Sequence, residues 1–169
     1  MSVETTLRPP RVGDGEDLAR IWMEIGGYYA GLAADLFRVP DAVGLAAWFE
    51  EWAPTINSED VLFLVAERGG RIVGSVFATI SRPAGDARWQ VESELGLVRV
   101  TIEALGVEQA SWRQGVGTEL MTAAEEWARG RGAVVALLDT WIGSPVSVPF
   151  YEHRMGYDRR ALRMRKTLR

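Results

Sequence analysis

The segment ASWRQGVGTEL, residues 110–120, contains the residue types from which proteins build anion-binding turns. Gly115 and Gly117 lie two positions apart and are followed by Thr118 and by the beginning of a helical pattern. Such a turn brings unpaired backbone N–H groups and the positive end of a helix dipole to one point, which favours a bound phosphate. Glycine also permits tight turns with positive φ. Three interpretations therefore compete: a nucleotide-binding loop, a coenzyme A-binding loop and a purely structural turn.

The pattern of apolar residues predicts alternating helices and strands around this turn. Two helices are expected near the N-terminus, over about 15–26 and from Asp41 onward. A hairpin follows that turns at Gly69 and Gly70, and then a polar loop over 81–95. The later expected elements are a strand at 97–107, a helix at 116–130, a strand at 133–141, a turn and short helix at 144–151, and a closing strand LRMRKTL. The turn thus joins a strand to a helix inside a β-α-β unit.

Local signals predict where the two N-terminal helices begin and end. Asp14 and Asp41 are side chains of the type that accepts hydrogen bonds at the first turn of a helix. Gly26 and Gly27 interrupt the helical pattern and are expected to end the first helix.

Two nucleotide-binding patterns do not fit the turn. A Walker A loop requires Lys followed by Ser or Thr after its last glycine, whereas Thr118 and Glu119 follow Gly117 here. A dinucleotide fingerprint requires a third small residue where Leu120 stands, and it usually lies early in the chain. The coenzyme A loop and the structural turn remain.

Together, these motifs resemble the GNAT superfamily of acetyl-CoA-dependent N-acetyltransferases. The resemblance covers about residues 15–168 and rests on three stretches: IEALGVEQASWRQGVGTELM, which is similar to the family's acetyl-CoA motif, the later SVPFYEHRMGY, and the preceding hairpin FLVAERGGRIVGSVFATI. It implies a single GNAT-type domain over residues 1–169. It also implies an α/β (α+β) fold with a mixed, mostly antiparallel central sheet, helices on both faces and a splayed strand pair at the acetyl-CoA site.

The resemblance further implies which residues bind acetyl-CoA as the cosubstrate. The exposed backbone of the strand before the turn would hold the pantetheine arm, and the N–H groups of the turn would hold the pyrophosphate. The expected binding residues are Leu105, Gly106, Val107, Trp112, Arg113, Gln114, Gly115, Val116, Gly117, Thr118, Ser144 and Tyr151. Trp112 and Ser144 depart from the family pattern, which usually has Gln or Arg at the first position and Asn at the second. Arg113 is a candidate to supply the missing charge, and a serine hydroxyl still bonds an amide.

The chemistry of acyl transfer to an amine defines the catalytic residues to look for. A lysine-like amine has a pKa of about 10.4 and needs a base, whereas the departing thiolate, with a pKa of about 8.5, needs a proton donor. Tyr151 stands where family members place that donor, and Glu103 lies on the strand that often carries the base. Glu92, Glu94 or a water molecule are alternatives for the base, and a packed aromatic is the alternative for Tyr151.

Composition limits the other classes of function. The chain of 169 residues is 47% apolar and 25% charged, as in an ordinary globular protein. Cysteine is absent and His153 is the only histidine, so we expect no disulfide, no cysteine nucleophile and no metal. A net charge of −4 argues against nucleic-acid binding. No apolar run is long enough to cross a membrane and no signal-like N-terminus is present, so a cytoplasmic protein is predicted.

The acceptor is expected to be a primary amine, and we favour a small molecule over a protein amine. An aminoglycoside-type drug is a further alternative. Aromatic and acidic side chains together attract cations, and the N-terminal third with the 81–95 loop contains many of them: Trp22, Tyr28, Tyr29, Phe37, Trp48, Trp52, Trp89, Glu24, Asp35, Glu50 and Glu51. Core packing is the other interpretation of these aromatics. A catalytically inactive acyl-CoA-binding or interaction module is the second functional hypothesis, and a homodimer is an open alternative.

Overall fold

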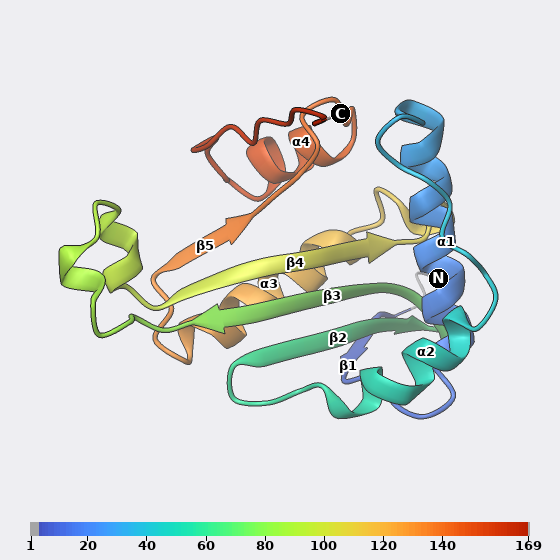
Figure 1. Cartoon of the computed structure of the whole chain (residues 1–169). Helices are drawn as coiled ribbons and strands as arrows, with labels where there is room; N and C mark the ends of the chain where they lie inside the picture. Colours follow the sequence, from blue (N-terminus) through green and yellow to red (C-terminus); the bar gives the residue numbers. More distant parts are fainter. Residues whose placement is uncertain (1–3, 169) are drawn as a thin grey trace. The chain divides into compact units, whose positions relative to one another are not determined.

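The computed structural model describes residues 4–168, which fall into two compact units, one through Asp139 and one from Thr140 onward. The first unit contains a sheet with the strand order β1-β2-β3-β4-β5 (Figure 1). Its strands are β1 Thr6–Arg8, β2 Val61–Arg68, β3 Arg71–Ser81, β4 Arg99–Val107 and β5 Val135–Leu138. Strands β1 to β4 pair antiparallel, and only the β4–β5 pair is parallel. The predicted mixed, mostly antiparallel sheet is therefore confirmed.

Helices cover both faces of this sheet, as expected. Helices α1 (Gly15–Leu32) and α2 (Leu45–Trp52) lie on one face and α3 (Val116–Arg129) on the other (Figure 1). Two strand glycines show which helix covers which face. A Cβ at Gly106 would meet Ile21 and Ile25 of α1. A Cβ at Gly74 would instead meet Val116 and Leu120 of α3. Glycine at these two strand positions permits the close approach of each helix to the sheet.

The core between α1, α2 and the sheet is aromatic and aliphatic. Leu18 and Ile21 of α1 pack with Phe49 of α2 and with Phe63 of β2. Trp52 stacks on Phe63 with ring centroids 5.3 Å apart and an interplanar angle of 15°. Core packing thus explains part of the aromatic residues that the sequence offered for an acceptor cleft.

Helix α1 continues past the predicted end at Gly26 and Gly27, and that prediction was wrong. A Cβ on Gly26 would lie 2.4 Å from Cδ of Pro40 and 3.0 Å from the carbonyl oxygen of Arg38. Gly26 is therefore a point of close packing between α1 and the following segment, and the helix extends to Leu32.

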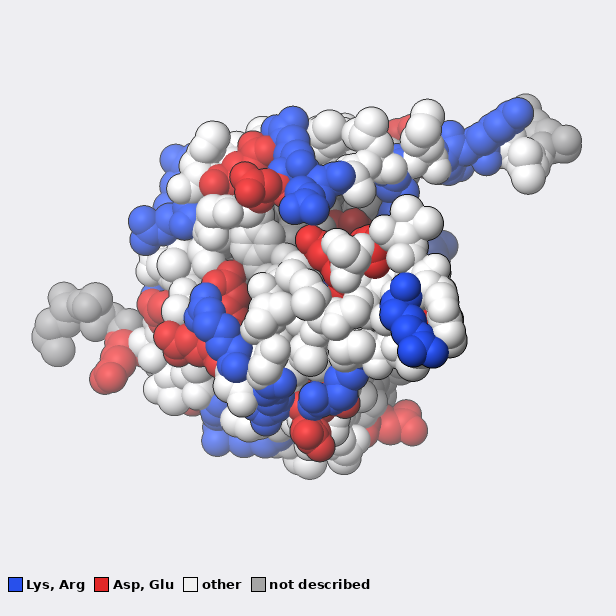
Figure 2. Space-filling model, turned by 90° about the vertical axis from the view of Figure 1, so that its left-hand side faces the viewer, with Lys and Arg blue, Asp and Glu red and all other residues white. Residues whose placement is uncertain are grey.

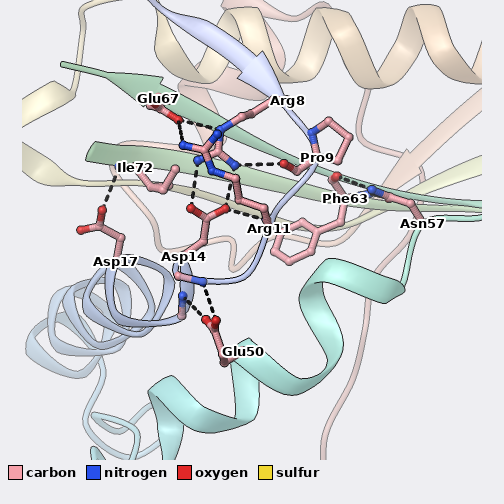
Figure 3. Close-up of polar contacts among 12 residues, drawn as sticks. Arg8, Pro9, Arg11, Asp14, Asp17, Glu50, Asn57, Phe63, Glu67 and Ile72 are labelled. Atoms are coloured by element: carbon pink, nitrogen blue, oxygen red, sulfur yellow. Dashed lines mark hydrogen bonds and ion pairs between the residues drawn. The ribbon is translucent and has the colours of Figure 1, made fainter. Parts of the chain in front are cut away.

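The first turn of α1 is fixed by side chains from other elements and not by Asp14 itself (Figure 3). Asp14 occupies the N-cap position, but its carboxylate accepts hydrogen bonds from Arg8 at 2.7 Å and 2.9 Å and from the N–H of Arg11 at 2.8 Å. Burial alone would raise the pKa of Asp14, but these bonds outweigh it and hold the pKa below its ordinary value. The ionised carboxylate thus stabilises the fold above the ordinary pKa of Asp, and this contribution is lost as the pH falls through the lowered pKa.

The cap of α1 comes from Glu50 of α2. Its carboxylate accepts the N–H of Gly15 at 2.9 Å and also the N–H of Gly13 (Figure 3). We expect Glu50→Gln to lower the free energy of unfolding by about 0.5–2 kcal/mol, the range for a lost helix cap. Chemical denaturation measures the change, with Glu51→Gln as the matched control because Glu51 is exposed on the same helix. Equal stability of the two variants would contradict the capping role.

Three further local features differ from the expectations. Helix α2 begins at Leu45 after Gly44, and Asp41 instead accepts the N–H of Val43 at 2.9 Å. The strand β1 was missed because three residues give too short an alternation to detect. The expected strand at 133–141 is limited to β5.

The second unit contains α4 (Ser147–Pro149) and a π-helical turn, Phe150–Arg154. Residues 157–168 have no regular secondary structure, so the predicted closing strand LRMRKTL was wrong. Its apolar side chains at Leu162, Met164 and Leu168 are exposed. Alternation alone does not make a strand, since the backbone also needs a hydrogen-bonding neighbour.

The surface charges concern nucleic-acid binding, and the helices concern membrane insertion. Basic and acidic side chains are interspersed on the face shown in Figure 2, which disfavours strong attraction of a polyanion there. Within residues 4–168, no helix is both long and apolar enough to cross a membrane.

Candidate functional site

Strand β4 has an open edge in its second half. Strand β5 pairs with β4 only from Arg99↔Val135 to Ile102↔Leu138, and the described part of β5 has no partner for residues 103–107. The predicted splayed strand pair is therefore present in the first unit. Within the first unit, one side of β4 therefore has no strand partner from Glu103 to Val107.

The direction of one peptide group shows which backbone groups face this open edge. The N–H of Glu108 donates to the carbonyl of Val73 on β3 at 2.9 Å. The carbonyl of Val107 belongs to the same peptide and points the opposite way, away from β3. Because peptide directions alternate along a strand, the N–H and C=O groups of Leu105 share that direction. The two residues expected to offer their backbone, Leu105 and Val107, thus present it on the side away from β3.

The segment after β4 forms a compact turn that begins α3. The backbone of Arg113 has φ 59° and that of Gly115 has φ 90°, both in the left-handed region. A left-handed residue before a helical one orients successive N–H groups toward a common point that suits an anion. The first bond of α3 runs from the N–H of Glu119 to the carbonyl of Gly115, so the amides of Val116 and Gly117 precede the hydrogen-bonded ladder of the helix.

Side chains from distant elements hold this turn, and sequence reasoning missed them. Arg20 of α1 donates to Glu108 at 2.8 Å, and the hydroxyl of Ser111 donates to the other oxygen of the same carboxylate at 2.9 Å. Glu108 is only 8% exposed. Arg68 of β2 donates to the side chain of Gln114 at 2.9 Å and to its carbonyl at 3.1 Å. Both ends of the turn are therefore anchored to the sheet and to α1.

Trp112 fastens the middle of the turn to the end of β4. Its indole N–H donates to the Val107 carbonyl at 2.7 Å. Its ring packs edge-to-face on Tyr28 of α1, with centroids 5.1 Å apart and an angle of 89°. The hydroxyl of Tyr28 is buried and has no hydrogen-bond partner among the described residues. No sequence signal indicated this contact, because Tyr28 and Trp112 are far apart in the chain.

The charges around the turn have both signs. Arg113 is exposed, and Arg68 lies against Gln114. Glu119 lies in the first turn of α3, where its carboxylate interacts favourably with the helix dipole.

Two further carboxylates lie at the beginning of the turn: Glu108 is paired with Arg20, and Glu24 accepts the N–H of Gln109. The attraction of an anion to this turn therefore depends mainly on its backbone N–H groups.

Glu103 lies at a β-bulge next to the open edge. The register changes from Ala78↔Ile102 to Phe77↔Ala104, so Glu103 is the extra residue on β4. Bulges re-aim side chains and are frequent beside active sites. The exposed carboxylate of Glu103 accepts a hydrogen bond from the hydroxyl of Thr79 at 2.6 Å, which orients it. The structure thus provides an oriented, accessible carboxylate at the position that the sequence indicated for a base.

The remaining candidate residues lie in the second unit. The ring of Tyr151 packs on Phe150 at 5.2 Å and on Tyr157 at 6.1 Å between centroids, within the π-helical turn. Such turns are frequent at functional sites, and the same contacts also fit a packed aromatic. Ser144 is 3% exposed, and its hydroxyl oxygen accepts the N–H of Ser147 at 3.0 Å, which leaves its own O–H as a donor. His153 is exposed. No group of three or more His, Cys, Asp or Glu within residues 4–168 could hold a metal.

Comparison with models of known protein families identifies the family of this chain. The family model of the acetyltransferase (GNAT) family matches residues 29–157, which include β2 to β5, the turn and the π-helical turn. The chain belongs to the GNAT acetyltransferase family. Members of this family use acetyl-CoA.

Solved structures show the same fold. A transcriptional regulator from Bacillus halodurans C-125 is 25% identical, with a TM-score of 0.69 over 96% of this chain and 100% of that one. An acetyltransferase from Trypanosoma brucei is 22% identical, with a TM-score of 0.64 over 98% of this chain and 100% of that one. An aminoglycoside N-acetyltransferase in complex with CoA is 16% identical, with a TM-score of 0.65 over 99% of this chain and 98% of that one. No curated protein sequence matches significantly.

Within the GNAT framework, Trp112 is the unusual feature of the turn. Where Gln or Arg is usual, this chain has an indole that bonds the end of β4 and packs on α1.

Proposed function

We propose that this GNAT protein transfers the acetyl group of acetyl-CoA to a primary amine of a small molecule. The observation that carries the proposal is the open edge of β4 at Leu105 and Val107, which leads directly into the turn at the beginning of α3. These two features suit the two chemically different parts of coenzyme A, an amide-containing arm and a diphosphate.

The backbone groups present fit such a ligand. The N–H and C=O groups of Leu105 and the N–H of Val107 would pair with the amides of the pantetheine arm, as a neighbouring strand does. The amides from Arg113 to Thr118 would bind the diphosphate, because anions bind at helix N-termini. In the second unit, Ser144 would donate its O–H to an amide of the arm. No metal takes part in this proposal.

The proposed reaction is a direct attack. The nitrogen of the neutral amine attacks the thioester carbonyl carbon, the C–S bond breaks, and an amide and free coenzyme A result. Glu103, directly or through a water molecule, takes the proton of the ammonium form and so supplies the neutral amine. After the attack the nitrogen loses a second proton to water, and Tyr151 gives the proton that the departing thiolate gains. Protons and charge balance, since the nitrogen gives one proton to the carboxylate and one to water, and the sulfur gains one from the phenol. The bond from Thr79 supports the role of Glu103, because it holds the carboxylate in one orientation.

A cationic amine with an apolar body is the acceptor that the first unit supports best. Phe77 on β3 lies next to the bulge that carries Glu103 and 6.1 Å from Trp52 between ring centroids. Trp48 on α2 is 52% exposed. An aromatic surface beside one carboxylate favours a small monocation through cation–π and ionic contacts.

The deciding experiment measures thiol release from acetyl-CoA across a panel of small primary amines, followed by mass spectrometry of the product. We expect turnover with at least one amine and a product heavier by one acetyl group. Calorimetric titration in parallel should show binding of coenzyme A and no binding of ATP or NAD. Binding of ATP without binding of coenzyme A would overturn the proposal.

The same experiment separates the alternative, a catalytically inactive acyl-CoA-binding or interaction module. Such a module would bind coenzyme A in the titration and release no thiol with any amine, lysine peptides included. The oriented carboxylate of Glu103 favours the enzyme.

Glu103→Gln tests the proposed base. At neutral pH we expect kcat/KM to fall by about 10²-fold or more, the usual contribution of a general base. The loss should shrink as the pH approaches about 10, because the amine then loses its proton without help. Steady-state rates from about pH 6 to 10 measure this, with Glu126→Gln as the control for another exposed carboxylate, on α3. Parallel pH profiles of Glu103→Gln and the parent protein would assign the base elsewhere.

A further inference from the structure

Trp112 makes two contacts that no other residue of the turn makes together. Its N–H bonds the Val107 carbonyl, and its ring packs on Tyr28. The Val107 carbonyl points away from β3, toward the open edge of β4, because the N–H of the same peptide donates to Val73 on β3. The indole therefore takes the last acceptor of that edge.

The hydrogen bond from Trp112 to Val107 joins the two parts of the protein that coenzyme A would contact, the edge of β4 and the turn. On one side of it is the open edge at Leu105 and Val107, and on the other is the left-handed turn at Arg113 and Gly115. The ends of the turn have their own anchors, from Arg20 to Glu108 and from Arg68 to Gln114. Between these anchors, the indole fixes the position of the turn relative to the strand edge.

We infer that Trp112 is a positioning residue for coenzyme A: its indole N–H holds the diphosphate-binding turn in register with the pantetheine-binding edge of β4. This inference rests on the proposed function. It assigns Trp112 a role that depends on a ring N–H and not on the charge of the Arg usual in the family. The hydrogen bond from Trp112 also orders the turn before the ligand binds. Binding then does not include the free-energy cost of ordering the turn.

Trp112→Phe tests the inference, because it removes the N–H and keeps a ring against Tyr28. We expect the Kd for coenzyme A and the KM for acetyl-CoA to rise together by about three- to tenfold, the worth of one hydrogen bond, with kcat unchanged. In the ligand-free variant, amide hydrogen exchange of residues 108–117 should become faster while the strands keep their protection. An unchanged exchange rate in that segment, or a kcat that falls while KM stays constant, would overturn the inference.

Two controls separate the N–H from general effects of substitution. Trp127→Phe removes an indole N–H on α3, where the ring packs under Arg131 at 4.6 Å, and should leave the Kd unchanged. Tyr28→Phe removes a buried hydroxyl without a described partner and keeps the edge-to-face contact, so it should also leave the Kd unchanged. The parent protein distinguishes the two proposals: if it does not bind coenzyme A, the proposed function fails, whereas the exchange measurement without ligand still tests whether Trp112 fixes the turn.

Discussion

Tyr151→Phe is expected to lower kcat by about 10²- to 10⁴-fold and to leave the affinity for coenzyme A within about twofold of the parent. General acid catalysis contributes a factor of this size. The ring contacts with Phe150 and Tyr157 survive in Phe, so the aromatic packing around this residue should be retained. Only the hydroxyl is removed, and with it the proton for the departing thiolate. Steady-state kinetics with an accepted amine and titration with coenzyme A measure the two quantities.

Tyr157→Phe is the matched control for this substitution. It removes the hydroxyl of the neighbouring ring and leaves the packing with Tyr151 in place. We expect its kcat to stay close to that of the parent. If Tyr151→Phe retains turnover within a factor of about two, Tyr151 is a packed aromatic and the thiol leaves with a proton from water or from the amine.

Gly117→Asp is expected to remove most of the affinity for coenzyme A while the fold persists. Gly117 is the second residue of α3, where its amide precedes the hydrogen-bonded ladder. A carboxylate there would repel the diphosphate, and a side chain would hinder close approach of a ligand to the backbone. The same substitution favours the helix itself, since an acidic residue suits the first turn and replaces a glycine. Affinity and thermal stability should therefore change in opposite directions.

Gly117→Asn separates charge from size at this position. Asn has nearly the same shape without the charge, so its loss of affinity should be clearly smaller than that of Asp. Titration with coenzyme A and thermal denaturation without ligand provide both measurements. A Gly117→Asp variant that binds coenzyme A as the parent does would show that residues 112–118 form a structural turn only.

The sequence by itself determined the elements with strong periodicity and the type of turn that joins two of them. The apolar alternation of β2 and β3, the glycine pair between them and the amphipathic spacing in α3 are local signals, and local signals need no knowledge of the rest of the chain. The motif around Gly115 and Gly117 depends on backbone conformation that glycine makes accessible. The family resemblance followed from this motif together with the preceding hairpin and the later SVPFYEHRMGY stretch.

Only the tertiary structure decided how the ends of these elements are fixed and what surrounds the candidate residues. Glu50 caps α1 from a different helix, and Gly26 lies within α1, where Pro40 packs closely against it. The bulge that re-aims Glu103 depends on the register between β3 and β4. Trp112 bonds Val107 and packs on Tyr28 of α1, so its two contacts are with residues of different elements. These contacts join residues that are distant in the chain, and their geometry depends on the packed sheet and helices and not on any local pattern.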